Sequence, residues 1–422
     1  MNKKPKAMDL FAGAGGLSKG LESAGFDIIW ALDYEEHCKP TYDSNHDCKL
    51  GIEDIREIDP RDIEISPDEV DFVAGGPPCP TFSVVGRSKI NSISDRKNTD
   101  DDRHQLYQDF LTFIDYFQPE AFVMENVQGM LSAENEDGRK VVKVIADEME
   151  DLGYNVEYQL LNAADFGVPQ HRERLFFIGS KDGELPDMKK WRTHIKPSSE
   201  SEKKIKLKGR DERHAHQRTL QDLKNKNTSF PNFRKNSSRK PWNTVADAII
   251  DLPPLSPKGD MPPKKIKEYT APALSKYQVW ARDIGSSNSW ESEELYNHEA
   301  RGQNLRDLTI YKMLGEGVSY KIGDLPEDVQ PFRNDIFNDN IKKQNPREPA
   351  STVVAHIAKD GHMFVHPTEA RSISVREAAR FQSFRDTFNF PVSRTQAFKQ
   401  IGNAVPPLLA EAIGTAILKK IL

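Results

Sequence analysis

The chain has 422 residues, of which 37% are hydrophobic and 29% are charged, and its formal net charge is −6. This length suits one or two domains, and the low hydrophobic share leaves much of the chain as surface or solvated insertion. Three cysteines are too few for a disulfide framework, so a reducing compartment is expected. Neither a membrane span nor a signal peptide is visible in the sequence, since no apolar run approaches the ~18–20 residues that a span needs. These features predict a soluble intracellular protein.

A glycine-rich turn between a strand and a helix is the first chemical signal. Residues 7–11 read as a buried strand, and residues 12–16 contain three glycines before a pattern of helical periodicity. A second strand, residues 26–32, delivers Asp33. Such a turn, with an acid about 20 residues on, is typical of nucleoside binding, because the acid accepts hydrogen bonds from ribose hydroxyls. A plain tight turn and a helix cap are the alternatives for these two features.

Another acid follows the third expected strand, residues 48–52. Asp54 could accept a hydrogen bond from the exocyclic amine of an adenine, while Ile55 covers the face of the base. The alternative for Asp54 is a solvated acid in a loop.

The fourth expected strand, residues 70–74, ends in Gly-Gly-Pro-Pro and then Cys79. Loops at the carboxyl ends of strands carry the chemistry of open α/β sheets, and a thiol is the strongest common nucleophile near neutral pH. A lone cysteine is more often a buried apolar residue, but this setting favours a reactive one. The polar residues 84–103 follow without periodicity, which predicts a functional loop or lid.

A fifth strand, residues 121–124, ends at Glu125, so another strand end carries an acid. A helix over 140–152 and strands over 156–161 and 175–179 complete an alternation of strands and helices. This order predicts an α/β fold with a doubly wound, mainly parallel sheet.

The charge composition changes sharply after the last of these strands. Residues 188–240 contain 17 Lys and Arg against 5 Asp and Glu, a balance of +12 within a chain of −6. Phe230, Phe233 and Trp242 are interleaved with the basic residues, which favours a phosphate-backbone partner over a solvated linker.

Order is expected again from residue 347 onward. Ser374, with Glu377 three residues later, predicts a capped helix. Asn403 precedes two prolines and a final helix with an apolar face, and by itself this asparagine favours a helix cap.

The order of these motifs resembles that of the DNA (cytosine-5) methyltransferases over nearly the whole chain. The matching segments are residues 9–16 (Asp-Leu-Phe-x-Gly-x-Gly-Gly), 76–79 (Gly-Pro-Pro-Cys), 125–127 (Glu-Asn-Val), 170–174 (Gln-x-Arg-x-Arg), 376–380 (Arg-Glu-Ala-Ala-Arg) and 402–407 (Gly-Asn-Ala-Val-Pro-Pro). The resemblance implies a class I S-adenosylmethionine-dependent methyltransferase fold. It also implies a catalytic domain over 1–182, completed by 396–422, and a smaller target-recognition domain over 183–395, variable over about 183–345.

The same resemblance implies the chemistry of the site. Cys79 adds to C6 of a cytosine flipped out of the duplex, and C5 then accepts the methyl group of S-adenosyl-L-methionine. Glu125 holds or protonates N3 of the base and binds its 4-amino group. Arg172 and Arg174 hold the base at O2 and steady Glu125 or the nearby phosphate.

Further residues follow from the resemblance and from the basic segment. The cofactor residues would be Phe11, Gly13, Gly15, Leu17, Asp33, Asp54, Ile55, Pro78, Asn403 and Ala404. The DNA contacts would be Ser83, Arg87, Gln170, Lys203, Lys204, Lys206 and Lys208. We expect double-stranded DNA as partner, S-adenosyl-L-homocysteine as product, no metal and no membrane. We also expect a monomer in a prokaryotic cytoplasm, with a cognate restriction endonuclease acting separately.

Departures from the family pattern are few. Pro80 stands where glutamine commonly follows the nucleophile, and Asp33 stands where glutamate is frequent. A tRNA methyltransferase of the related branch would carry a Cys-Phe-Thr tripeptide, yet no cysteine follows Cys79. An amino-methyltransferase would show Asp/Asn-Pro-Pro-aromatic at the fourth strand instead of Gly-Pro-Pro-Cys. A nicotinamide dehydrogenase would share the glycine turn but leave Cys79, Glu125 and the arginine pair unexplained. Intact Cys79, Glu125 and Asn403 argue against an inactive DNA-binding module. The target sequence is not readable from the chain.

Overall fold

The computed structural model describes residues 4–78, 106–135, 137–197, 239–255, 268–283, 294–315, 317, 319–321, 324–325, 330, 340–355 and 361–422. The chain divides into two compact units. The first comprises Met1–Phe166, Glu173–Arg192 and Ala404–Leu422, and the second comprises Gly167–Arg172 and Thr193–Asn403. The domain boundaries expected at 182/183 and 395/396 stay a prediction.

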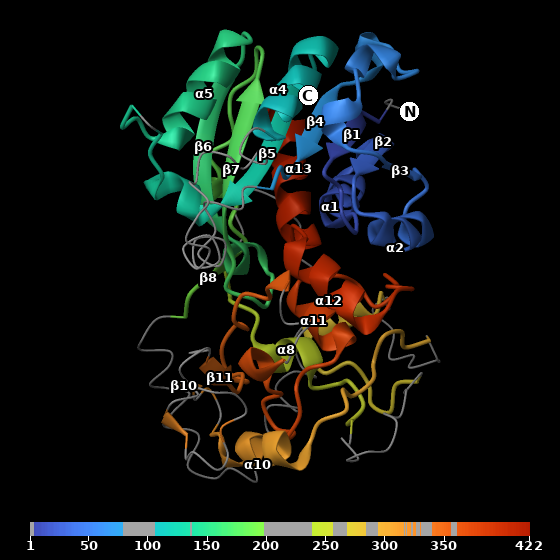
Figure 1. Ribbon diagram of the computed structural model, residues 1–422, viewed down its shortest axis with the longest axis vertical. Coiled ribbons are helices and arrows are strands. Elements are labelled where there is room, and N and C mark those ends of the chain that lie inside the picture. Colours follow the sequence, from blue (N-terminus) through green and yellow to red (C-terminus); the bar gives the residue numbers. More distant parts are fainter. Residues whose placement is uncertain are drawn as a thin grey trace, which may run out of the picture. The chain divides into compact units, whose positions relative to one another are not determined.

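A seven-stranded sheet forms the centre of the first unit, with the order β3-β2-β1-β4-β5-β7-β6 (Figure 1). The strands are β1 (Lys6–Leu10), β2 (Asp27–Asp33), β3 (Leu50–Ile52), β4 (Phe72–Gly75), β5 (Ala121–Val127), β6 (Asn155–Asn162) and β7 (Glu173–Ser180). The first five run parallel, and β7 lies antiparallel between β5 and β6. All seven strands expected from the sequence are therefore present, and the predicted mainly parallel α/β sheet is confirmed.

Helices cover both faces of this sheet. They are α1 (Gly16–Ala24), α2 (Lys39–Asn45), α4 (Leu106–Phe117), α5 (Val141–Asp151) and α13 (Pro407–Lys420). Met8 and Leu10 of β1 join one apolar core with α4 and α5. Asp9, between them, points to the opposite face, where it contacts α1. The C-terminal α13 packs on that same face against α1, so close that a side chain at Gly20 would overlap Ala410.

The second unit is built from short elements. Its helices are α8 (Val245–Ile249), α9 (Lys276–Ala281), α10 (Leu305–Met313), α11 (Val375–Phe381) and α12 (Arg394–Asn403). Two pairs of short strands accompany them, β8 (His194–Ile195) with β9 (Lys240–Pro241) and β10 (Ser319–Lys321) with β11 (Asn340–Lys342). The expected capping box of α11 is confirmed, since Ser374 and Glu377 each bond the backbone of the other.

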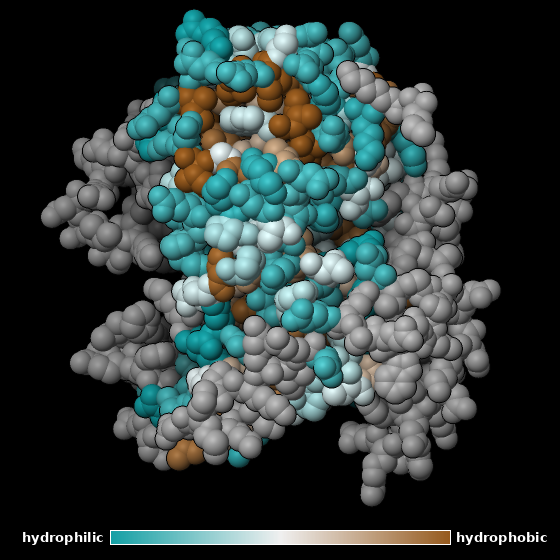
Figure 2. Space-filling model, turned by 90° about the vertical axis from the view of Figure 1, so that its right-hand side faces the viewer, coloured by the Kyte–Doolittle hydropathy of each residue, from teal (hydrophilic) through white to brown (hydrophobic). Residues whose placement is uncertain are grey.

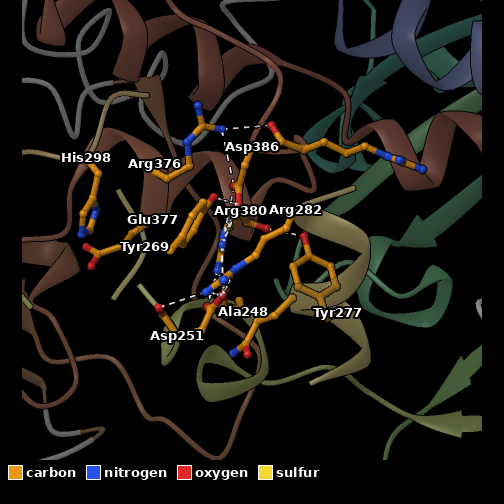
Figure 3. A network of polar contacts seen from close by, with 12 residues as sticks. Ala248, Asp251, Tyr269, Tyr277, Arg282, His298, Arg376, Glu377, Arg380 and Asp386 are labelled. Atoms are coloured by element: carbon orange, nitrogen blue, oxygen red, sulfur yellow. Dashed lines mark hydrogen bonds and ion pairs between the residues drawn. The ribbon is translucent and has the colours of Figure 1, made fainter. Parts of the chain in front are cut away.

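A network of buried ionic contacts surrounds α11 (Figure 3). Arg380 is fully buried, and its guanidinium bonds the carboxylates of Asp251 and Asp386 and the carbonyl of Ala248. Arg282 shares Asp251, with Nε 2.7 Å from a carboxylate oxygen. Buried charges are tolerable only when paired in this way. The network therefore fixes how α8, α9 and α11 pack together.

Surface polarity varies over the face shown in Figure 2, where apolar side chains gather around a hollow amid mostly hydrophilic neighbours. One helical stretch among the described residues, Arg394–Lys420, is long and apolar enough to cross a membrane. Because 78% of its most apolar window is buried within the protein, this stretch has the environment of a core helix.

Candidate active site

Left-handed backbone shapes the turn after β1. Phe11, Gly13 and Gly15 have φ angles of 65°, 56° and 86°. Glycine adopts such angles without strain, but phenylalanine does so only where its surroundings hold it there. Strained backbone of this kind gathers at ligand-binding sites, so Phe11 marks the turn as a candidate site.

Asp33, at the end of β2, is tied to this turn. One carboxylate oxygen accepts the Gly13 N–H at 2.8 Å, and the other accepts the Glu35 N–H at 2.9 Å. The acid thus holds the glycine turn against the end of β2 and remains half-buried at that edge of the sheet. The glycine turn and the acid predicted from the sequence therefore meet in space.

Asp9 caps α1 from the neighbouring strand. Gly15, at the helix N-cap, has no side chain to offer, and Oδ2 of Asp9 instead accepts the Ser18 N–H and is bonded by the Ser18 hydroxyl. Asp9 is completely buried, and its Oδ1 has no hydrogen-bond partner within the described part of the chain. Burial raises the pKa of this carboxyl to about 7.

Asp54 and Ile55 follow β3, as expected. Asp54 caps a short 3-10 helix and forms an ion pair with Arg56, which lowers the pKa of its carboxyl. Ile55 is 5% exposed and belongs to the main apolar core of the first unit. It also lines a cavity of about 670 Å³, whose other walls are residues 56–61 and the side of α4 from Asp109 to Tyr116. Leu17, in α1, is likewise buried.

Glu125 and Arg174 form an ion pair between neighbouring strands. Nε of Arg174 lies 2.8 Å from Oε1 of Glu125, and both side chains are largely but not completely buried, Arg174 at 17% and Glu125 at 13% exposed. A largely desolvated pair attracts more strongly than a surface pair, and its remaining exposure leaves room for a ligand to approach.

The Gly-Gly-Pro-Pro loop lies beside this pair. β4 and β5 are adjacent and parallel, with Gly75 opposite Met124. A side chain on Gly76 would come within 3.3 Å of a Glu125 carboxylate oxygen, so the glycine permits this close approach. Asn126 donates a hydrogen bond to the Pro77 carbonyl at 3.2 Å. Glu125 is thus brought to the loop that leads to Cys79, and Pro78 is exposed at the end of this described segment.

Arg172 and Gln170 are buried and bonded to protein groups. Arg172 is 1% exposed, and its guanidinium donates to the carbonyls of Val353 and Gly402. Gln170 is 0% exposed and is bonded to backbone and to Gln382. The expected contacts of Arg172 with a base and of Gln170 with DNA stay predictions, and each would require a side chain that is now covered to be released.

Asn403 ends α12 with an exposed side chain, and the half-buried Ala404 begins the turn into α13. The remaining predicted residues lie outside the described part of the chain: Cys79, Ser83, Arg87, Lys203, Lys204, Lys206 and Lys208. Within the described part, no three or more His, Cys, Asp or Glu side chains gather as metal ligands would.

Tyr34 was not among the predicted site residues. It follows Asp33 directly and is 64% exposed, which is unusual for a large aromatic side chain. An aromatic residue directly after an acid that is expected to bind ribose was the available sequence signal, because such a ring can stack on a base.

The order of the strands and the residues at their ends define the class of enzyme to which the first unit belongs. An open sheet with β7 inserted antiparallel between β5 and β6, and with a glycine turn after β1, is the arrangement of class I methyltransferases. The family model for C-5 cytosine-specific DNA methylases matches residues 6–419. The chain therefore belongs to this family and is a DNA (cytosine-5) methyltransferase.

Relatives with similar sequences match this chain over nearly its full length. The chain is 33% identical to the type II methyltransferase M.AgeI of Thalassovita gelatinovora, covering 98% of this chain and 99% of that protein. It is 32% identical to M.DdeI of Desulfomicrobium norvegicum, covering 97% and 88%. Among solved structures, a candidate DNA modification methyltransferase encoded within an E. coli prophage superposes with a TM-score of 0.65 at 22% identity, covering 99% of both chains. That structure supports the fold alone.

Proposed function

We propose that the protein methylates C5 of a cytosine within a specific sequence of double-stranded DNA, with S-adenosyl-L-methionine as donor and Cys79 as nucleophile. The observation that carries this proposal is the Glu125–Arg174 ion pair beside Gly76, three residues before Cys79. A carboxyl group and a guanidinium at the approach to a thiol suit an aromatic base that must be held, polarised and attacked.

The residues after β1 and β2 fit the cofactor. Its ribose would meet the Asp33 carboxylate, and its adenine would meet the exposed ring of Tyr34 and the strained Phe11. The buried Oδ1 of Asp9 beneath the glycine turn has no partner among the described residues and would accept a hydrogen bond from a bound donor group. The Asp54 carboxylate is paired with Arg56. It would accept a hydrogen bond from an adenine amine only if Arg56 moved away or shared the carboxylate with the base. When bound, the cofactor supplies a methyl group on a sulfonium as the electrophile.

The protein residues act on the base in a defined order. The Cys79 thiolate forms a bond to C6 while Glu125 donates a proton to N3, which places the electron pair at C5. Arg174 holds the O2 of the base and keeps Glu125 oriented. After methyl transfer a base removes the C5 proton, the C5–C6 double bond re-forms as the thiolate leaves, and N3 returns its proton to Glu125. A cytosine stacked in a duplex cannot reach Cys79, so it must be flipped out, and we assign the closing segment to residues 84–103.

DNA binding would draw on the basic segment. The balance of +12 over residues 188–240 suits a phosphate backbone, with Lys203, Lys204, Lys206 and Lys208 as candidate contacts. Ser83 and Arg87 lie close to Cys79 in the sequence and would contact the flipped nucleotide or its phosphates.

A place in restriction–modification follows from the relatives, which are named type II methyltransferases. We propose that the enzyme protects its own host's DNA as a cytoplasmic monomer, with the cognate endonuclease as a separate protein. Methylation of a defined site that blocks one restriction enzyme on the same DNA would support this role.

Trapping on DNA that contains 5-fluorocytosine tests the reaction and its nucleophile together. Fluorine cannot leave as a proton does, so the wild-type enzyme with S-adenosyl-L-methionine should stall as an adduct that survives denaturing electrophoresis. Cys79→Ser should bind cofactor and DNA but give no adduct. An adduct that persists in Cys79→Ser would remove Cys79 from its proposed role, and the absence of an adduct in an active wild-type enzyme would exclude covalent catalysis.

A further inference from the structure

Two glutamines and one arginine join four distant segments of the second unit. Gln170 and Arg172 lie in the short segment that precedes β7, and Gln382 follows α11. Their side chains bond backbone at residues 353, 381 and 401–402. We call Gln170, Arg172 and Gln382 the amide–arginine cluster.

Gln170 is bonded at both ends of its amide. Its Oε1 accepts the Val353 N–H at 2.7 Å, and its Nε2 donates to the Phe381 carbonyl at 3.1 Å and to Oε1 of Gln382. Gln382, also 0% exposed, donates from its Nε2 to the Ile401 carbonyl at 2.9 Å. Each glutamine thereby fixes the orientation of the other. Reversing either amide would place two N–H donors or two carbonyl acceptors face to face.

Arg172 completes the cluster with two parallel contacts. One guanidinium nitrogen donates to the Val353 carbonyl at 2.9 Å, and the other donates to the Gly402 carbonyl at 3.0 Å. Gly402 leaves no space at this point, since a side chain there would lie 2.3 Å from the Ala355 nitrogen. The carbonyl that Arg172 holds therefore belongs to a residue pressed directly against the 353–355 segment.

Gln382 is joined through the backbone to the ionic network around α11, which Figure 3 shows. Gln382 comes two residues after Arg380, whose guanidinium is fixed by Asp251 and Asp386. The Arg380 carbonyl in turn accepts the Tyr277 hydroxyl. Buried and multiply bonded groups of this kind move little, so the position of Gln382 is set from the interior of the unit.

Both ends of the cluster adjoin residues of the proposed site. Gly402 immediately precedes Asn403, a proposed cofactor ligand, and Arg172 lies two residues before Arg174, the proposed partner of the base. We propose that Gln170, Arg172 and Gln382 are positioning residues that fix the backbone of residues 401–403 and so set Asn403 for cofactor binding. This inference rests on the proposed function, and within it on Asn403 as a cofactor ligand, which the family resemblance implies.

Burial separates this role from direct contact with DNA or the base. Gln170 and Arg172 are 0% and 1% exposed, and their amide and guanidinium groups are already bonded to protein. A contact with DNA would leave the Val353 N–H and the Val353 and Gly402 carbonyls without these partners. Unpaired buried groups are costly, so the observed bonding favours positioning.

The test uses the full-length enzyme with Gln170→Met and Gln382→Met, singly and together. Methionine keeps the length of the side chain but removes its hydrogen bonds. Gln396→Met, on the half-exposed side of α12, is the matched control. Calorimetry with S-adenosyl-L-homocysteine, without DNA, should show affinity weakened about tenfold in each cluster variant. The double variant should lose little more than either single one, since both remove the same bonded unit. The control should bind as the wild type does.

Kinetics and hydrogen exchange then distinguish positioning from other roles. The KM for the cofactor should rise while the KM for DNA and its salt dependence stay unchanged. Amides of residues 401–405 should exchange faster in the cluster variants. A raised KM for DNA with unchanged cofactor affinity would overturn the proposal and restore Gln170 as a DNA contact. Arg172→Lys, which can hold only one of the two carbonyls, should fall between the wild type and the methionine variants; normal cofactor affinity in it would also count against the proposal.

Asn403→Ala separates this inference from the proposed function. If that variant binds cofactor normally while the cluster variants still accelerate exchange at 401–405, the assignment of Asn403 as a ligand fails. Positioning of the cofactor through this residue is then overturned as well. If Asn403→Ala weakens cofactor binding and the cluster variants do not, the assignment of Asn403 stands and the cluster proposal alone is refuted.

Discussion

Replacing Asp251 by asparagine should destabilise the second unit strongly. Its carboxylate is 0% exposed and lies between two arginines, with Arg380 Nη1 2.5 Å from Oδ1 and Arg282 Nε 2.7 Å from Oδ2. Asparagine keeps the shape but loses the charge and one acceptor. Arg380 retains Asp386, whereas Arg282 retains the Asp251 backbone carbonyl and the ring of Tyr269, 3.8 Å away, neither of which carries a negative charge.

The expected cost follows from the charge left unpaired. Breaking a buried ion pair by removing one partner costs about 3–5 kcal/mol, because the remaining ion stays desolvated. With a urea m-value of about 1–3 kcal/mol/M, the midpoint of unfolding should fall by about 1 M or more. Urea titrations followed by circular dichroism measure this shift.

Asp59→Asn is the matched control. It makes the same exchange in an exposed ion pair with Arg61 and should leave the midpoint almost unchanged. Equal, small shifts in the two variants would show that the buried network around Arg380 does not hold the second unit together.

Glu125→Gln should lower kcat about 10²–10⁴-fold with cofactor affinity unchanged in a binding assay, because it removes the proposed proton donor to N3; normal turnover would exclude that role. Tyr34→Ala should weaken S-adenosyl-L-homocysteine binding severalfold in calorimetry if its exposed ring stacks on adenine. Burial raises the pKa of Asp9 to about 7, so the folded protein favours the protonated carboxyl. The free energy of unfolding that this preference supplies is complete below about pH 4 and is lost as pH rises through 7. Asp9→Asn should remove this pH dependence from melting temperatures measured between pH 4 and 8. The same pH dependence in the variant and the wild type would contradict the role of Asp9.

Local pattern accounts for most of the first unit. Short buried strands, a helix closed by Gly25 and acids at strand ends can be read from neighbouring residues, and the structure has each of them. In a parallel sheet the carboxyl ends of strands share one edge. The meeting of Asp33 with the glycine turn, and of Glu125 with the loop after β4, therefore followed from strand order.

The sequence by itself thus determined the sheet, the glycine turn and the family. Only the tertiary structure decided what Gln170 and Arg172 touch. The carbonyl partners of Arg172 lie 181 and 230 residues away in the chain, and no local pattern encodes such a pairing. A buried side chain takes the partners that folding brings to it, because leaving its polar atoms unpaired is costly. That requirement, set by the fold as a whole, gives Gln170 and Arg172 backbone partners next to Asn403 that the motif alone does not predict.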